Sequence, residues 1–304
     1  MLIRAPTVSA SPKSRYRWAM HRLAGASLLD AASGLTLFLV VVFGFDAWWA
    51  KFVGYAAFLV YMLYPQSIKS WPFWGAIAAA STFALLSEWY AADNHKFLLA
   101  YWLWVMTLAH AVRPLGFQEV LLVTNARFFA VFIFLGAALQ KFFSPTYMSG
   151  EMFETLLLLD DRFRAFAVLA GIDPLIPDTA VKAATLLKST MSIVDNNTLI
   201  FPSNDRLNFI ARLITWYDVY FQFAIGLLFL SGRRATDLVG HCLLLFFVFT
   251  TYLPAPVLGF GWTLAIMGFI LAKHRFQYLP ALYLASFIAI LLYQAPWREW
   301  VLQT

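Results

Sequence analysis

Long apolar runs separated by short polar stretches cover most of the chain. An α-helix that crosses a bilayer needs about 20 consecutive apolar residues. The runs that meet this description approximately lie at 27–48, 50–65, 72–90, 97–114, 122–142, 209–231, 235–253, 256–273 and 277–294. The pattern therefore predicts an all-α fold, a polytopic transmembrane helical bundle of about nine spans.

One polar segment, 143–208, interrupts this pattern and carries half of the acidic residues of the chain. Apolar positions recur at helical spacing over 151–170 and over 179–194. Pro174 and Pro177 separate the two stretches. We therefore expect two short helices that form a cap on the outer face of the bundle.

Composition agrees with a membrane protein and excludes other classes. The chain is 62% hydrophobic and only 12% charged, and its mean hydropathy is +0.70. Such a chain cannot cover its surface with polar groups, so the expected partner is the lipid bilayer and not nucleic acid, despite the net charge of +6. The single cysteine, Cys242, excludes an intramolecular disulfide and a CxxC redox pair.

Lysine and arginine are concentrated in alternate short connections, which predicts the orientation of the chain. We expect an integral protein of a bacterial inner membrane, with its N-terminus in the cytoplasm and its C-terminus outside. The expected parts are a basic cytoplasmic interfacial segment (1–25), five spans (26–142), an extracytoplasmic loop with short helices (143–208), four spans (209–295) and an outer tail (296–304).

Ionisable residues at membrane depth are costly, so each is a functional candidate. Lys141, at the end of the fifth predicted span, falls at the same outer depth as His95, and we predict these two as the catalytic pair. The other candidates share predicted positions at the ends of spans or on helix faces inside the bundle. They are predicted to line a substrate or cofactor pocket: Asn94, Glu88, Asp93, His110, Asp218 and His241.

Plain structural roles remain open for the same residues. Lys141 is also expected to reach toward the lipid headgroups. Asp218 is expected to pair with Arg212 or Arg127. His241 is expected to bond a neighbouring carbonyl group. No metal site is predicted, because the sequence has no zinc-type cluster of cysteine and histidine.

Three segments together resemble a known family. The first is Asp93-Asn94-His95-Lys96-Phe97-Leu98-Leu99, followed by His110; the second is 127–150, a span that ends in a lysine and an aromatic-containing turn; the third is 216–273. In this order they resemble the horizontally transferred transmembrane (HTTM) family, which includes the vitamin K-dependent carboxylases. The likeness covers roughly 20–275.

The resemblance implies quinone chemistry. Its cofactor would be a reduced quinone that reacts with oxygen, and Lys141 matches the lysine that takes a proton from the hydroquinone. His95, with Asn94, matches the histidine beside the active site. A dry site would protect the strong base that forms in this chemistry from water.

Two functions stay open. The first is a quinone-using enzyme with a lysine base at the outer membrane face. The second is a non-catalytic structural or accessory subunit that binds other membrane protein subunits. The chain ends at Thr304, shortly after the last predicted span, so we expect no large extramembrane substrate domain of the carboxylase kind. A pocket that holds both Lys141 and His95 would favour the enzyme.

Overall fold

The computed structural model confirms the all-α class. It describes residues 27–44, 47–87, 89, 94–112, 115–190, 205–252, 258–273 and 275–293. Over these residues the chain forms thirteen α-helices and one 3-10 helix, and no strand. The helices belong to two compact units, Met1–Leu122 and Val123–Thr304, which we describe separately.

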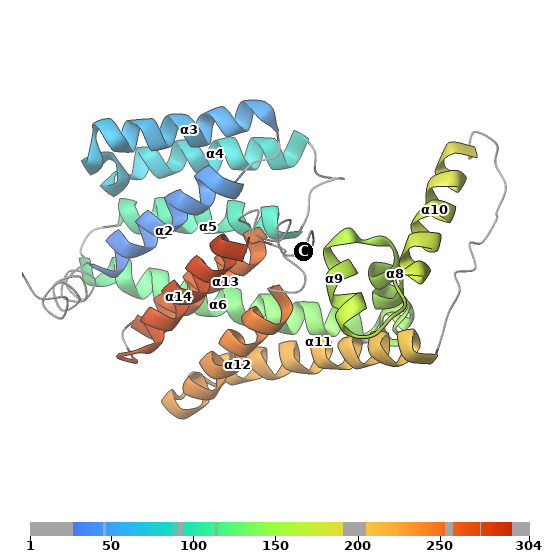
Figure 1. Ribbon diagram of the computed structural model, residues 1–304. Helices are drawn as coiled ribbons and strands as arrows, with labels where there is room; N and C mark the ends of the chain where they lie inside the picture. Colours follow the sequence, from blue (N-terminus) through green and yellow to red (C-terminus); the bar gives the residue numbers. More distant parts are fainter. Residues whose placement is uncertain are drawn as a thin grey trace, which may run out of the picture. The chain divides into compact units, whose positions relative to one another are not determined.

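The first unit consists of four helices and a short 3-10 turn, followed by the start of α6. Their bounds are α2 (Leu28–Phe43), α3 (Trp48–Leu63), η1 (Pro65–Lys69), α4 (Trp71–Ser87), α5 (Asn94–Ala111) and α6 (Leu115–Phe142). Helix α4 packs along both α3 and α5 (Figure 1). Helix α6 continues into the second unit.

Two fully buried tryptophans stabilise the first unit. Trp74 donates its indole N–H to the Ile68 carbonyl at 2.7 Å, and Trp102 donates to Thr36 Oγ1 at 2.9 Å. A buried indole N–H needs an acceptor, because leaving it unpaired costs free energy. These bonds tie α4 to η1, and α5 to α2.

The second unit combines membrane-type helices with a cap. The remaining long helices are α11 (Asp205–Ser231), α12 (Arg234–Tyr252), α13 (Leu258–Lys273) and α14 (Leu279–Tyr293). The cap consists of α7 (Pro145–Met148), α8 (Glu151–Leu159), α9 (Asp161–Leu169) and α10 (Leu175–Thr190). Helix α11 packs against α12, and α13 packs against α14 (Figure 1).

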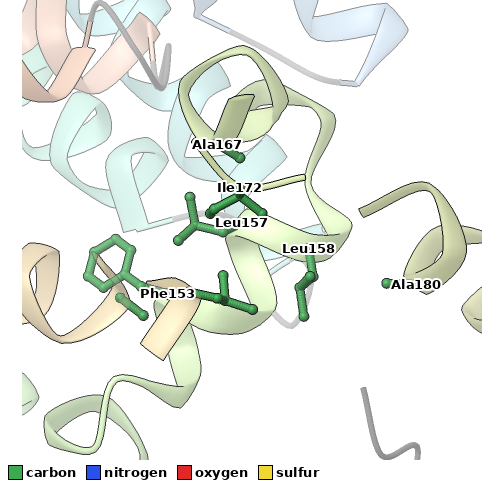
Figure 2. Close-up of a cluster of buried hydrophobic side chains, with 8 residues drawn as sticks. Phe153, Leu157, Leu158, Ala167, Ile172 and Ala180 are labelled. Carbon is green, nitrogen blue, oxygen red and sulfur yellow. The ribbon is translucent and has the colours of Figure 1, made fainter. Parts of the chain in front are cut away.

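The cap has its own apolar core, which holds it on the first half of α11. Figure 2 shows this cluster, in which side chains of α8, α9 and α10 meet. Leu207 and Ala211 of α11 complete it, and both are almost fully buried. Burial of such side chains contributes roughly 1–3 kcal/mol each. The cap is therefore a packed part of the second unit.

The cap helices differ in detail from the prediction. The expected helix over 151–170 is two helices, because Asp160 leaves the helical conformation and accepts a hydrogen bond from the Arg162 N–H at 3.0 Å, as an N-cap does. The next helix begins at Leu175, earlier than expected, with Pro177 in its first turn. Proline is tolerated there because that N–H has no helical partner. Residues 191–194 lie outside the described residues.

A helix lies over each of the nine predicted apolar runs, but nine crossings are not confirmed. Within the described residues, three helices are long and apolar enough to cross a membrane: Gly116–Phe142, Asp205–Ser231 and Arg234–Thr251. Five further apolar helices in the same part of the chain have only 10–17 residues. A helix of 16 residues such as α3 reaches about 24 Å, less than the roughly 30 Å hydrocarbon core.

Exposed apolar side chains are consistent with contact between the protein and a bilayer. On α3, Trp48, Phe52, Leu59 and Leu63 are each more than half exposed. Water is a poor solvent for such a face, whereas lipid is a good one. The predicted terminal segments, 1–25 and 296–304, lie outside the described residues.

Candidate functional site

A lysine and an aspartate form an ion pair inside the second unit. Lys141 lies in the last turn of α6, and Asp218 lies near the middle of α11. The distance from Lys141 Nζ to Asp218 Oδ2 is 2.5 Å. The Asp218 side chain is only 9% exposed and that of Lys141 24%. A carboxylate that is buried to this extent is costly unless a cation pairs with it.

Two further side chains bind the same carboxylate. Gln222, one turn after Asp218, donates its amide to Asp218 Oδ1 at 2.7 Å and accepts from Lys141 Nζ at 3.1 Å. The Tyr147 hydroxyl donates to Asp218 Oδ2. Burial, and then the Asp218 charge, raise the pKa of Tyr147 far above its usual range. We call Lys141, Tyr147, Asp218 and Gln222 the Asp218 network.

The turn after α6 brings Tyr147 to this network. Ser144 Oγ accepts from the Tyr147 N–H at 3.3 Å, and Pro145 begins α7. Gly150 then takes φ +92°, a conformation that suits glycine, and a Cβ there would lie 3.1 Å from Arg212 Cγ. The chain thus reverses above α6, and the Lys141 ammonium lies 5.2 Å from the centre of the Tyr147 ring.

The Asp218 network forms part of the wall of a cavity of about 570 Å³. The rest of the lining is mostly aromatic and aliphatic. It comes from the cap (Phe153, Phe163, Phe166), α11 (Leu213, Ile214, Tyr217), α12 (Phe246, Phe247, Thr250, Thr251) and α13 (Phe260). A largely apolar pocket with a few convergent polar groups is the usual form of a small-molecule site.

Hydroxyl groups add a second polar region to the lining. Tyr217 and Thr250 share a hydrogen bond between α11 and α12. The Thr251 hydroxyl is buried and has no hydrogen-bond partner within the described part of the chain. An occupant would therefore meet one charged pair, the hydroxyl pair of Tyr217 and Thr250, and many aromatic faces.

His241 does not line this cavity. Its Nδ1 lies 2.8 Å from the Tyr283 hydroxyl, and its ring packs on Phe229 and Phe276. The partner of His241 is thus a tyrosine hydroxyl of α14, and the expected bond to a carbonyl is not the contact found. His241 is 1% exposed.

The expectation that Asp218 pairs with Arg212 or Arg127 was wrong. Arg127 donates instead to both oxygens of Asp237, at 2.8 Å and 2.7 Å, and to the Phe229 carbonyl at 2.8 Å. Asp218 takes Lys141 as its partner. The fifth predicted span is therefore joined by one ion pair to the sixth, through Asp218, and by another to the seventh, through Asp237.

The other predicted site residues belong to the first unit. His110 Nε2 lies 2.9 Å from Ser33 Oγ, and its ring stacks on Trp74 at 6.0 Å and 7°. His95 packs against the Phe43 ring at 5.1 Å. Asn94 begins α5, while Glu88 and Asp93 lie outside the described residues. The pairing of His95 with Lys141 stays a prediction.

Metal ligands do not gather in the described residues, where no three His, Cys, Asp or Glu side chains are placed to hold an ion. No protein-family model, curated protein or solved structure matches the chain. The residues that line the cavity are therefore the guide to the chemistry it can carry out.

Proposed function

We propose that the protein is an integral membrane protein of the HTTM type that binds a reduced quinone in the 570 Å³ cavity and takes a proton from it with the Lys141–Asp218 pair. The observation that carries this proposal is the ion pair on the wall of an otherwise aromatic cavity. Charged groups are costly in such surroundings and are retained where they serve binding or chemistry.

The lining suits a flat apolar ring. Phe163 and Phe166 come from the cap, and Phe246 and Phe247 come from α12. Aromatic faces pack well on other aromatic rings. The volume also falls within the range of roughly 300–1,000 Å³ that is typical of small-molecule pockets.

Asp218 and Lys141 supply complementary parts of a proton transfer. A hydroquinone O–H donates its proton to the Asp218 carboxylate, and the Lys141 ammonium stabilises the oxyanion that remains. Such a contact is stronger beside a largely apolar wall than in bulk water. Because Lys141 is paired with a carboxylate, the pair and not the lysine alone is the proposed base.

The membrane setting belongs to the same proposal. Lysine and arginine in the short connections support a cytoplasmic N-terminus, which would place the cap on the outer face of a bacterial inner membrane. His95 enters as a second catalytic residue through the family resemblance. The cavity proposal does not depend on it.

Oxygen consumption by the full-length protein in detergent, with reduced benzoquinone or naphthoquinone, tests this proposal. We expect Lys141→Met and Asp218→Asn to lower the rate at least roughly 100-fold, as loss of a general base does. Lys51→Met, at an exposed position of α3, is the matched control and should keep the wild-type rate. No oxidation by folded wild type would contradict the proposal and favour the accessory-subunit role.

A further inference from the structure

Two connections of the second unit meet around one buried carboxylate. Asp237, in the first turn of α12, is 1% exposed and binds Arg127 through both of its oxygens. Arg275, from the connection between α13 and α14, donates to Asp237 Oδ2 as well. Two guanidinium groups thus share one carboxylate.

Backbone contacts hold a third arginine beside them. Arg275 donates to the Gly232 carbonyl at 3.0 Å, which ties the α13–α14 connection to the α11–α12 connection. Arg234 donates to the Arg275 carbonyl at 3.3 Å, and its guanidinium lies 5.9 Å from the centre of the Phe276 ring. We call Arg127, Arg234 and Arg275 the arginine cluster.

The arginine cluster carries more positive charge than its acceptors neutralise. Three arginines contribute +3 and Asp237 contributes −1, which leaves +2. Both oxygens of Asp237 already accept from guanidinium groups. Among the described residues, the two exposed guanidinium groups of Arg234 and Arg275 have no carboxylate of their own besides Asp237, so the cluster is placed to attract an added anion.

Exposure leaves room for that anion. The Arg275 side chain is 38% exposed, and Arg234 is exposed, whereas Arg127 is only 21% exposed. Arg127 and Asp237 therefore anchor the cluster, and Arg234 and Arg275 present donors outward. Basic residues near helix ends are common in membrane proteins. The shared buried carboxylate and the hydrogen bonds to backbone carbonyl groups distinguish this cluster from a solvated basic loop.

We infer that the arginine cluster binds a phosphate group, from an anionic lipid headgroup or from a soluble phosphate ester. A guanidinium group matches phosphate oxygens with two parallel N–H donors. Both sources present the same oxygens. The inference is independent of the quinone cavity, since none of the three arginines lines it.

Ligand-dependent thermal stability of the full-length protein in detergent tests the inference. The unfolding midpoint is followed by tryptophan fluorescence against increasing phosphatidylglycerol, phosphatidylcholine or glycerol phosphate. The variants are Arg234→Gln, an exposed position that spares the Asp237 contacts, and Lys182→Gln, an exposed cap position that removes the same charge. Arg234→Lys keeps the positive charge but removes the two parallel N–H donors of the guanidinium group.

We expect phosphatidylglycerol, but not phosphatidylcholine, to raise the midpoint of wild type and of Lys182→Gln. Arg234→Gln should need roughly tenfold more lipid, as for loss of one charge-assisted contact. A rise with glycerol phosphate as well would assign the site to soluble phosphate esters, and a rise with lipid alone to a headgroup. Equal responses to both lipids, or an unchanged response of Arg234→Gln, would overturn the inference.

Discussion

Lys141 Nζ lies 2.5 Å from Asp218 Oδ2, although the two residues are 77 positions apart in the chain. The contact joins α6 to α11 at the wall of an aromatic cavity. It is both a structural tie between two long helices and the chemical centre of the proposed site.

Removal of one member of this pair should cost more stability than removal of both. Lys141→Met leaves the Asp218 charge buried without its cation, which costs about 3–5 kcal/mol. The double variant Lys141→Met/Asp218→Asn removes that unpaired charge and should recover part of the loss. Unfolding midpoints of Lys141→Met, Asp218→Asn and the double variant in detergent measure this coupling. Additive losses would show that the pair is not coupled.

Tyr147→Phe should change how stability depends on alkaline pH. Burial and the Asp218 charge raise the pKa of Tyr147 above the value near 10 that it has in the unfolded chain. Above about pH 10 the unfolded chain loses this proton first, so wild-type stability falls by up to about 1.4 kcal/mol per pH unit. Tyr147→Phe lacks this contribution.

The measurement is the unfolding midpoint of both proteins from about pH 9 to about pH 11. We expect the wild-type curve to fall more steeply than that of Tyr147→Phe above pH 10 or so. At neutral pH the variant should be less stable by roughly 1–3 kcal/mol, because Asp218 loses a donor. Parallel curves would mean that Tyr147 does not hold its proton through this contact.

Asp237→Asn should destabilise the protein more than Arg127→Met does. Asp237 binds both Arg127 and Arg275, so its neutralisation leaves two guanidinium groups without their carboxylate. The expected cost is about 3–5 kcal/mol. Arg127→Met leaves the Asp237 contact with Arg275 in place. Thermal unfolding of the two variants gives the order, and the reverse order would contradict the shared-carboxylate arrangement.

Gly268→Ala should loosen the contact between α13 and α14. A Cβ at Gly268 would lie 2.1 Å from Tyr283 Cε1, which no real contact allows. The ring must move, at a cost of about 1–3 kcal/mol, and its bond to His241 moves with it. Gly136→Ala on α6 meets nothing within 4 Å and is the control. Equal midpoints for the two variants would contradict this packing.

The helices were predictable from the sequence, whereas nine membrane crossings stay a prediction, because three of the described helices are long and apolar enough to cross. Apolar runs mark a helix at each predicted position, because long stretches of lipid-compatible residues favour helices whose backbone bonds are internal. Helix length is decided by local chemistry. Tyr64 and Pro65, for example, end α3 after 16 residues.

The residues of the site were predictable in part. Lys141 and Asp218 stood out as ionisable groups in apolar runs. Their pairing did not, because helical spacing relates residues within one helix and is silent about a partner 77 positions away. Tyr147 was missed. The signal was its position in the short turn after Lys141, behind Ser144-Pro145, a sequence that begins a helix and reverses the chain.

Photolabelling tests the central claim, that the cavity beside Lys141 binds a quinone, most directly. Full-length protein in detergent is irradiated with an azido-naphthoquinone, with and without excess unlabelled quinone, and labelled residues are mapped by mass spectrometry. We predict competed labels on lining residues such as Tyr217, Phe246 and Phe166, and their loss in a variant with a filled cavity, Ile214→Trp. Labels confined to exposed faces such as that of α3, and unaffected by competition, would contradict the claim.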